Sequence, residues 1–416
     1  MELTKQQREM LERFKTLKVG ALFSQMGTGK TRVALELVRY NHPDFLLYIC
    51  PFSCKANIDA ELKKWGVDCE YEIVGYETLS GSDRKYTELR NKLDGYEKKF
   101  IIADESIFIK KGTTKRHRRA LALREKCQYA LVLNGTPITN NERDIYNQME
   151  FLSHKIFNMY YYEFLQTFFI EHVYKDRRSA REIHVWDFYE PNRPAFSKVI
   201  APYVYMADLV FEKQEKSYFE YVPVDVEYKL ERDRILEGYM SYSQDSIISL
   251  FTVLASIAAE TQEKNERVAE YIDGRKCIVY CSRKDEMRQI AEQCDCFMIT
   301  GDTKEEDRKR IVKEFTECDN KPLVLSYGVG AYSLNLQTAH EIVYSSLTFN
   351  FGQYEQSKFR IKRMGQEQDI QYTYILPDAG IIRTMRDNLE SKTSLAEEIK
   401  YHIKHCDLKE WLQKAI

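Results

Sequence analysis

Short apolar runs alternate with amphipathic stretches through the first third of the chain. Four runs are apolar through most of their length, a pattern typical of strands that are buried on both faces of a sheet. They span residues 19–23, 45–51, 100–105 and 129–133. Between these runs, apolar residues recur at helical spacing. This alternation predicts a parallel sheet with helices on both faces.

The alternation stops near residue 142 and resumes in the second half. From about 142 to 215 the chain is rich in Tyr and Phe and shows no strand–helix pattern, which predicts a helical insertion and a linker. One crossing strand is expected at 222–226. Four later runs then predict a second α/β domain with a helical tail; they span residues 276–282, 297–302, 322–326 and 341–344.

Length and composition are consistent with this division. The chain has 416 residues, 44% of them hydrophobic, which is enough for domains with sizeable cores. We predict a first α/β domain at 1–153, the helical insertion and linker at 154–235, and a second α/β domain with its tail at 236–416. Ten scattered cysteines and no signal-peptide pattern predict free thiols in the cytoplasm. No apolar run approaches the roughly 20 residues of a membrane span.

The stretch Ser24–Thr31 reads S-Q-M-G-T-G-K-T and lies between the first apolar run and a helical pattern. A strand, a glycine turn and a helix start are the context of a phosphate-binding loop. Gly27 and Gly29 allow backbone N–H groups to curl inward, and the helix N-terminus adds positive potential. Lys30 is predicted to reach the β and γ phosphates, and Thr31 to hold Mg²⁺.

A pair of carboxylates, Asp104 and Glu105, ends a buried run about seventy residues after this loop. Phosphoryl transfer to water needs one carboxylate to hold Mg²⁺ and a second group to orient the attacking water. Asp104 is predicted for the first role and Glu105 for the second. The sequence therefore predicts ATP and Mg²⁺ as cofactors.

These motifs resemble those of superfamily 2 helicases, and within them the SNF2-like DNA translocases. Cys50–Ser53 and Tyr76–Leu79 resemble motifs Ia and Ib, and Leu133–Asn141 (L-N-G-T-P-I-T-N-N) is similar to motif III. Gln356–Gln366 (Q-S-K-F-R-I-K-R-M-G-Q) resembles motif VI and is the most specific match. The resemblance covers nearly the whole chain. It implies two tandem RecA-like domains with a helical insertion between them.

The resemblance also assigns roles to single residues. Gln7 lies where the family reads adenine, and the expected ATP-binding residues are Gln7, Met26, Gly27, Thr28, Gly29, Lys30, Thr31 and Arg32. Arg360 and Arg363, three positions apart, are expected to share one helix face and to stabilise charge on the γ-phosphate. The expected catalytic set is Lys30, Asp104, Glu105, Gln356, Arg360 and Arg363. Ile107 replaces the histidine of the family's D-E-A-H, which leaves open how hydrolysis is coupled to motif III.

The expected nucleic-acid partner is DNA, contacted through its backbone. The formal net charge is −2, so binding must come from local groups and be largely independent of sequence. The expected contact residues are Pro51, Ser53, Lys55, Thr136, Asn140, Ser282, Arg283, Ser326 and Asn335. A basic segment at 110–119 is equally consistent with a DNA contact or a solvated face. Tyr160–Tyr162 are expected in the core of the insertion rather than as a stacking platform.

The sequence thus predicts a monomeric, Mg²⁺-dependent ATPase that moves on or remodels DNA. The D-E-S-I-F-I-K-K form resembles bacteriophage or mobile-element relatives, which implies replication or recombination in a host cytoplasm, with replication proteins as candidate partners. Two alternatives stay open at this point: an RNA-dependent ATPase, and a nucleotide-gated DNA-binding protein with little turnover.

Overall fold

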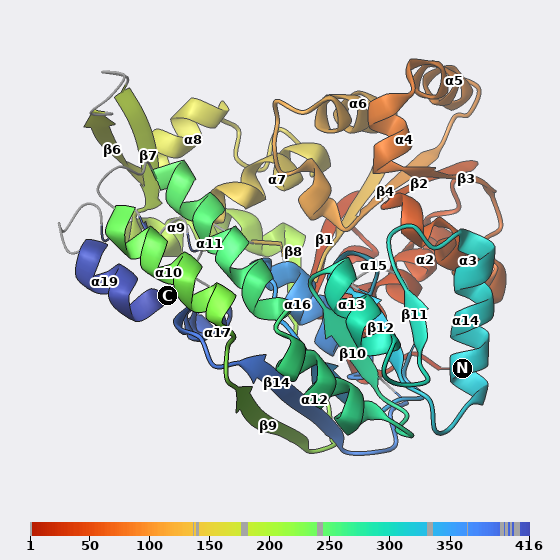
Figure 1. Cartoon of the computed structure of the whole chain (residues 1–416). Helices are drawn as coiled ribbons and strands as arrows, with labels where there is room; N and C mark the ends of the chain where they lie inside the picture. The colour runs from red at the N-terminus through yellow and green to blue at the C-terminus, as the bar shows by residue number, and fades with distance from the viewer. Residues whose placement is uncertain are drawn as a thin grey trace. The chain divides into compact units, whose positions relative to one another are not determined.

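The computed structural model describes residues 2–135, 137–138, 141–175, 182–238, 244–330, 336–363, 365–391, 395, 398–399, 402 and 408–416. The chain divides into two compact units, Met1–Val210 and Phe211–Ile416 (Figure 1). Each unit contains one six-stranded parallel sheet flanked by helices. The predicted fold class of two tandem α/β domains is therefore confirmed.

The sheet of the first unit has the order β3-β2-β4-β5-β1-β8, and every neighbouring pair is parallel. Its strands are β1 (Val19–Ser24), β2 (Phe45–Cys50), β3 (Glu70–Gly75), β4 (Lys99–Asp104), β5 (Tyr129–Leu133) and β8 (Val204–Ala207). Its main helices are α1 (Lys5–Phe14), α2 (Lys30–Asn41), α3 (Lys55–Trp65), α4 (Tyr76–Gly81), α5 (Asp83–Asp94), α6 (Lys115–Arg124) and α7 (Tyr146–Leu152).

Successive side chains of the central strands pack on opposite faces of this sheet, which explains their continuous hydrophobicity. On β4, Ile101 and Ala103 join the core covered by α4 to α7. Phe100 and Ile102 join the core covered by α1, α2 and α3 on the other face. Because both faces are buried, the carboxyl edge of the sheet is where polar groups can gather.

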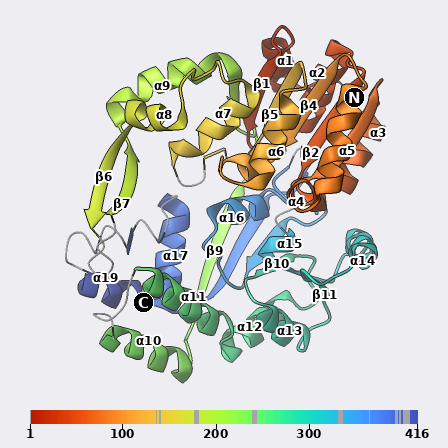
Figure 2. The same ribbon diagram turned by 90° about the horizontal axis from the view of Figure 1, so that it is seen from above.

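The segment after α7 differs from its prediction. Besides α8 (Tyr161–Phe168) and α9 (Arg193–Ile200), it contains an antiparallel hairpin of β6 (Phe169–Lys175) and β7 (Glu182–Phe188) (Figure 2). The expectation of a purely helical insertion is therefore wrong here. In β7, Ile183 and Val185 alternate with polar residues as strand residues do, whereas the β6 sequence F-I-E-H-V-Y-K shows no such alternation. Residues up to Val210 belong to the first unit, because β8 returns to pair with β1.

The sheet of the second unit has the order β11-β12-β10-β13-β14-β9, again all parallel. Its strands are β9 (Glu215–Val222), β10 (Ile278–Cys281), β11 (Phe297–Ile299), β12 (Leu323–Ser326), β13 (Glu341–Tyr344) and β14 (Ile370–Pro377). Its helices are α10 (Val226–Gly238), α11 (Gln244–Ala259), α12 (Gln262–Ile272), α13 (Lys284–Ala291), α14 (Glu305–Glu317), α15 (Tyr327–Gly330), α16 (Phe351–Lys358), α17 (Gly380–Ser391) and α19 (Leu408–Ala415).

The crossing strand expected at 222–226 is wrong in position. β9 ends at Val222, and α10 begins at Val226. Pro223 lacks the N–H that a strand needs, and the Asp225 carboxylate accepts a hydrogen bond of 3.1 Å from the Tyr228 amide in the first turn of α10. The segment predicted at 154–235 is thus divided between the two units at Val210.

Candidate nucleotide site

The loop after β1 is closed around the Lys30 side chain. Gly27 and Gly29 have φ values of +80° and +81°, which favour glycine, and Gly29 directly precedes α2. The Lys30 ammonium donates to the carbonyl oxygens of Ser24 at 2.6 Å and Gln25 at 3.1 Å. The Thr28 hydroxyl donates to the same Gln25 carbonyl at 2.8 Å. The loop therefore has the curled backbone that its sequence predicts.

Gln7 ties the first helix to this loop. Its side-chain amide donates to the Thr28 carbonyl at 3.2 Å, and the residue is buried. Its side-chain oxygen accepts from the Thr4 amide at 3.1 Å, and the Thr4 hydroxyl accepts from the Gln7 amide at 3.2 Å. This reciprocal cap fixes Gln7 beside the loop, but its role as an adenine reader stays a prediction.

Asp104 ends β4, two strands from the loop, and both of its carboxylate oxygens are bonded. The Tyr48 hydroxyl donates to Oδ2 at 2.9 Å, and the Glu105 amide donates to Oδ1 at 3.0 Å. Burial raises the pKa of Asp104, whereas the bond from Tyr48 and the nearby Lys30 charge lower it. The hydroxyl of a buried tyrosine therefore holds one oxygen of a predicted Mg²⁺ ligand.

Thr31 and Asp104 fit the chemistry of Mg²⁺. The ion prefers oxygen ligands and is commonly held by one or two protein groups together with substrate phosphates and water. Thr31 and Asp104 supply a hydroxyl and a carboxylate at one edge of the sheet. Among the described residues there is no group of three or more His, Cys, Asp or Glu side chains suited to a metal. This chain therefore suits a Mg²⁺ site in which Thr31 and Asp104 supply the protein ligands and the nucleotide phosphates supply others.

Glu105 has a left-handed backbone, with φ of +51° and ψ of +54°. Residues other than glycine seldom adopt this conformation, and such strain is concentrated at functional sites. The turn Ser106–Ile109 follows directly. The sequence predicted Glu105 from its chemistry, but no sequence pattern predicted its conformation.

A buried side-chain bridge joins this turn to the segment after β5. The Ser106 hydroxyl donates to the Gln148 side-chain oxygen at 2.6 Å, and the Gln148 amide donates to the Pro137 carbonyl at 2.8 Å. Ser106 and Gln148 are both fully buried. Although Ile107 replaces the family's histidine, Ser106 makes a link to motif III, which sequence reasoning missed.

The motif III segment also packs on the phosphate loop. A Cβ atom on Gly135 would lie 3.2 Å from Cγ of Met26 and 3.8 Å from Nζ of Lys30. A side chain at this position would therefore crowd the loop. Thr136 and Asn140, predicted to contact DNA, lie outside the described residues.

The motif Ia residues lie at the carboxyl end of β2. Pro51 is buried, Ser53 lies in a short turn, and Lys55 begins α3. The Phe52 amide donates to the Glu77 carboxylate at 2.9 Å, which joins motif Ia to motif Ib. The structure thus brings these two segments together, and their contact with DNA stays a prediction.

In the second unit, Arg360 and Arg363 differ from their predicted setting. Helix α16, which carries Gln356, ends at Lys358, so the two arginines lie in the turns after it. The expectation that they share a helix face is therefore wrong. Arg363 donates from Nε to the Phe359 carbonyl at 2.7 Å. Burial and the like charge of Arg360 hold the pKa of Arg363 well below its ordinary value, so an anion here would relieve repulsion.

The predicted DNA contacts of this unit are placed unevenly. Ser282 follows β10, and its amide donates to Oγ of Ser346 at 2.7 Å. The Arg283 guanidinium donates to α11, at the Ser256 hydroxyl and at the Thr252 carbonyl 3.4 Å away. Ser326 ends β12. Asn335 lies outside the described residues.

A fully buried ion pair lies beneath Ser282. The Lys264 ammonium donates to the Glu286 carboxylate at 2.8 Å and to the Ser345 hydroxyl at 2.8 Å, and the side chains of both ions have 0% exposure. Glu286 also accepts from the amide of Ser282 and from the hydroxyls of Ser345 and Ser346. Sequence reasoning missed this pair, because the two residues lie in ordinary charged helical patterns.

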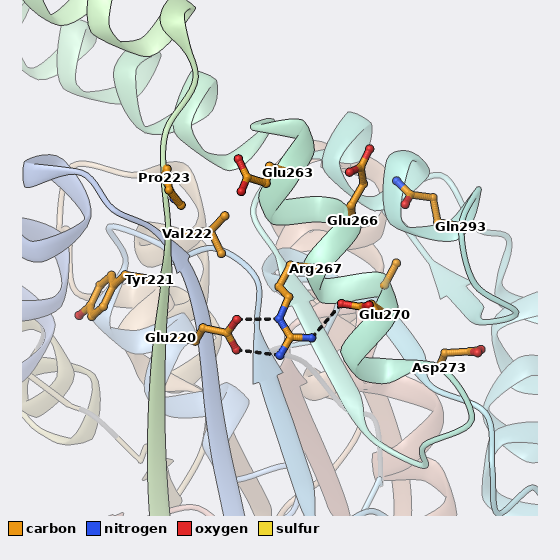
Figure 3. A pocket seen from close by; sticks show the side chains of 11 residues that line it. Glu220, Tyr221, Val222, Pro223, Glu263, Glu266, Arg267, Glu270, Asp273 and Gln293 are labelled. Atoms are coloured by element: carbon orange, nitrogen blue, oxygen red, sulfur yellow. Dashed lines mark hydrogen bonds and ion pairs between the residues drawn. The ribbon is translucent and has the colours of Figure 1, made fainter.

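The second unit also has a surface pocket of about 690 Å³ between β9 and α12 (Figure 3). Arg267 bonds there to Glu220 at 2.6 Å and 3.2 Å and to Glu270 at 3.1 Å. Glu263 and Glu266 also line the pocket. None of the predicted site residues lines it, and its acidic lining does not suit a phosphate.

Comparison with known proteins identifies both halves of the chain. Residues 51–187 match the SNF2-related domain, and residues 263–365 match the helicase conserved C-terminal domain. The chain belongs to the SNF2-like group of superfamily 2 helicases. No helix in the described ranges is long and apolar enough to cross a membrane.

Two curated relatives and one solved structure are among the proteins that this chain resembles. The chain is 22% identical to the Caenorhabditis elegans SWI/SNF-related matrix-associated actin-dependent regulator of chromatin subfamily A-like protein 1 homolog, over 85% of this chain and 55% of the relative. It is 21% identical to the mouse DNA annealing helicase and endonuclease ZRANB3, over 89% of this chain and 38% of the relative. The Sulfolobus solfataricus SWI2/SNF2 ATPase core in complex with dsDNA is 21% identical to this chain, with a TM-score of 0.44. The match covers all of this chain and 97% of that chain. The chain thus spans about half or less of the length of these curated relatives.

Proposed function

We propose that this protein hydrolyses ATP with Mg²⁺ and uses the cycle to move on, or remodel, DNA. The observation that carries the proposal is the placement of Lys30 and Thr31 at the start of α2 and of Asp104 at the end of β4, at the carboxyl edge of one parallel sheet. Ligands bind at this edge in open α/β folds. The SNF2-related and helicase C-terminal matches support the same activity.

Each residue of the site has a role in this proposal. The loop amides and Lys30 bind and orient the phosphates, and Glu105 orients the attacking water. Thr31 and Asp104 hold Mg²⁺, which when bound neutralises phosphate charge. Arg360 and Arg363, from the second unit, stabilise the charge that develops on the γ-phosphate, because guanidinium groups match phosphate oxygens in shape and charge.

The proposed nucleic-acid partner is DNA, because the relative ZRANB3 is a DNA annealing helicase and endonuclease. Contacts through Ser53, Lys55, Ser282 and Ser326 would position the backbone without reading bases. We propose replication or recombination of a bacteriophage or mobile element as the context, on the resemblance of the D-E-S-I-F-I-K-K form alone.

The test is the ATPase rate of the purified chain with duplex, single-stranded and forked DNA and with RNA in parallel. We expect stimulation by at least one DNA form and a steep loss of stimulation as salt rises, because counterions compete for the phosphates. Lys30→Ala serves as the blank for contaminating ATPases. Stimulation by RNA only would reject the DNA proposal, and turnover no greater than that of Lys30→Ala would reject the ATPase.

A further inference from the structure

Tyr48 occupies an unusual position for a tyrosine. It lies in the middle of β2, whose other residues are all apolar, and its ring is fully buried against the core beside α2 and α3. Phenylalanine would fill the same space. A buried tyrosine hydroxyl needs a hydrogen-bond partner, so its partners indicate why the oxygen is there.

The partner of this hydroxyl is the carboxylate assigned to Mg²⁺. The single O–H of Tyr48 donates to Oδ2 of Asp104 at 2.9 Å. Each carboxylate oxygen has two lone pairs, so Oδ2 can accept this bond and still bind a cation. The bond from Tyr48 therefore orients the carboxylate and leaves a lone pair of Oδ2 for Mg²⁺.

We propose that Tyr48 is a positioning residue that orients Asp104 as a Mg²⁺ ligand. This inference rests on the proposed function of the same site. The Tyr48 hydroxyl fixes one Asp104 oxygen, while the Glu105 amide fixes the other. Groups bonded to metal ligands commonly change metal affinity 10–100-fold when they are removed.

The chain offers a matched control in Tyr76. It is also fully buried, and its hydroxyl donates to the same residue, but to the main-chain carbonyl of Asp104 at 2.9 Å. Tyr48→Phe and Tyr76→Phe each remove one buried hydroxyl within reach of Asp104. Only the first removes a bond to a predicted metal ligand's side chain.

The experiment measures binding of a fluorescent ADP analogue in excess Mg²⁺ and again in EDTA. For each protein, the dissociation constant in EDTA divided by that in Mg²⁺ reports how much the metal strengthens nucleotide binding. This measurement needs no ATP hydrolysis. We expect Tyr48→Phe to lower this ratio by about 10-fold or more while leaving the affinity in EDTA unchanged. Tyr76→Phe should retain the wild-type ratio.

The outcomes separate this inference from the proposed function. A wild-type ratio in Tyr48→Phe, or an equal loss in Tyr76→Phe, would overturn the positioning role and leave the proposed function standing. A lower affinity in EDTA at an unchanged ratio would overturn it too, because that is loss of packing. Wild-type protein that binds no nucleotide, or binds it without regard to Mg²⁺, would overturn both.

Discussion

Both units place a lysine near the carboxyl ends of a parallel sheet, but the two lysines have different surroundings. Lys30 donates to the loop carbonyls of Ser24 and Gln25. Lys264 is fully buried and pairs directly with Glu286, whose remaining lone pairs accept from amides and hydroxyls of its own unit. The described bonds of the Lys30 ammonium include two to loop carbonyls, whereas Lys264 bonds directly to a buried carboxylate.

This difference separates a binding site from a structural one within the same architecture. In the second unit, the opposite charge comes from the chain itself, so nothing further is needed. In the first unit, the described bonds to the Asp104 carboxylate come from neutral groups, Tyr48 and the Glu105 amide. Phosphate and a cation would complete such an arrangement, whereas they would have no place at a satisfied ion pair.

The first prediction tests whether the second unit contributes to the chemistry at all. Arg363→Ala should lower the maximal ATPase rate by about 10³-fold or more, as loss of an arginine that stabilises phosphoryl transfer does. Nucleotide binding and the unfolding curve should be unchanged. Lys362→Ala, whose side chain pairs with Glu215 at 2.5 Å, is the adjacent control and should remain active. Normal turnover in Arg363→Ala would contradict the motif VI assignment.

The second prediction concerns the loop lysine. Lys30→Ala should lower the ATPase rate by at least about 10²-fold, because it removes the cation assigned to the transferred phosphate. Its unfolding free energy should stay within about 0.5 kcal/mol of wild type, because the lost bonds go to loop carbonyls. If Lys30→Ala instead unfolds the first unit, the loop lysine has the structural role that we assign to Lys264.

The third prediction concerns the buried pair. Lys264→Ala should destabilise the second unit by about 3–5 kcal/mol, because it leaves the Glu286 charge buried without its partner. Tryptophan occurs at Trp65, Trp186 and Trp411, and only the last lies in the second unit. Urea unfolding can therefore be followed by Trp411 fluorescence after the other two are replaced by Phe.

A double-variant cycle sharpens this result. Lys264→Met combined with Glu286→Gln removes both charges. The double variant should therefore lose less unfolding free energy than the sum of the losses in Lys264→Met and Glu286→Gln, by about 0.5–3 kcal/mol. Additive losses would contradict direct pairing. No change in the ATPase rate per folded molecule is expected.

The sequence predicts the parts of the molecule whose chemistry is local. Strands β1, β2, β4 and β5 were found because burial on both faces leaves a continuous apolar run. Edge strands β3 and β8 were missed because their outward residues are partly exposed, so their pattern is mixed. The phosphate loop was found because its glycines and lysine must be adjacent in the chain.

Residues that only the fold brings together could not be predicted from the sequence. Lys264 and Glu286 are 22 positions apart on two helices, and nothing local distinguishes them from surface charges. Arg360 and Arg363 were expected on a helix because their spacing fits one, but α16 ends before them. Tyr48 did carry a signal, because a tyrosine within an apolar run must find a partner for its hydroxyl.

The smallest expected effect concerns the stability of the nucleotide-free protein against pH. Burial raises the pKa of Asp104 in the folded protein above that in the unfolded chain, so the folded state binds the proton more tightly. The resulting stability is present at low pH and is lost as pH rises through the folded-state pKa. Asp104→Asn has no charge to bury, so above that pKa it should melt at a higher temperature than wild type. Toward pH 4 the difference should shrink.

Asp83 provides a control of opposite sign. Lys115 and Arg119 hold the pKa of Asp83 at about 2 in the folded protein. Its contribution to folding stability is therefore present above the pKa that it has in the unfolded chain, and is lost as pH falls toward the folded-state pKa. Asp83→Asn should therefore melt slightly lower than wild type at neutral pH and equal to it near pH 2. Thermal melts of both variants across this range would show differences of opposite sign. If Asp104→Asn melts below wild type at pH 8, the folded protein stabilises the charged form of Asp104, as it does that of Glu286. The contrast that we draw between the two units would then be wrong for these carboxylates.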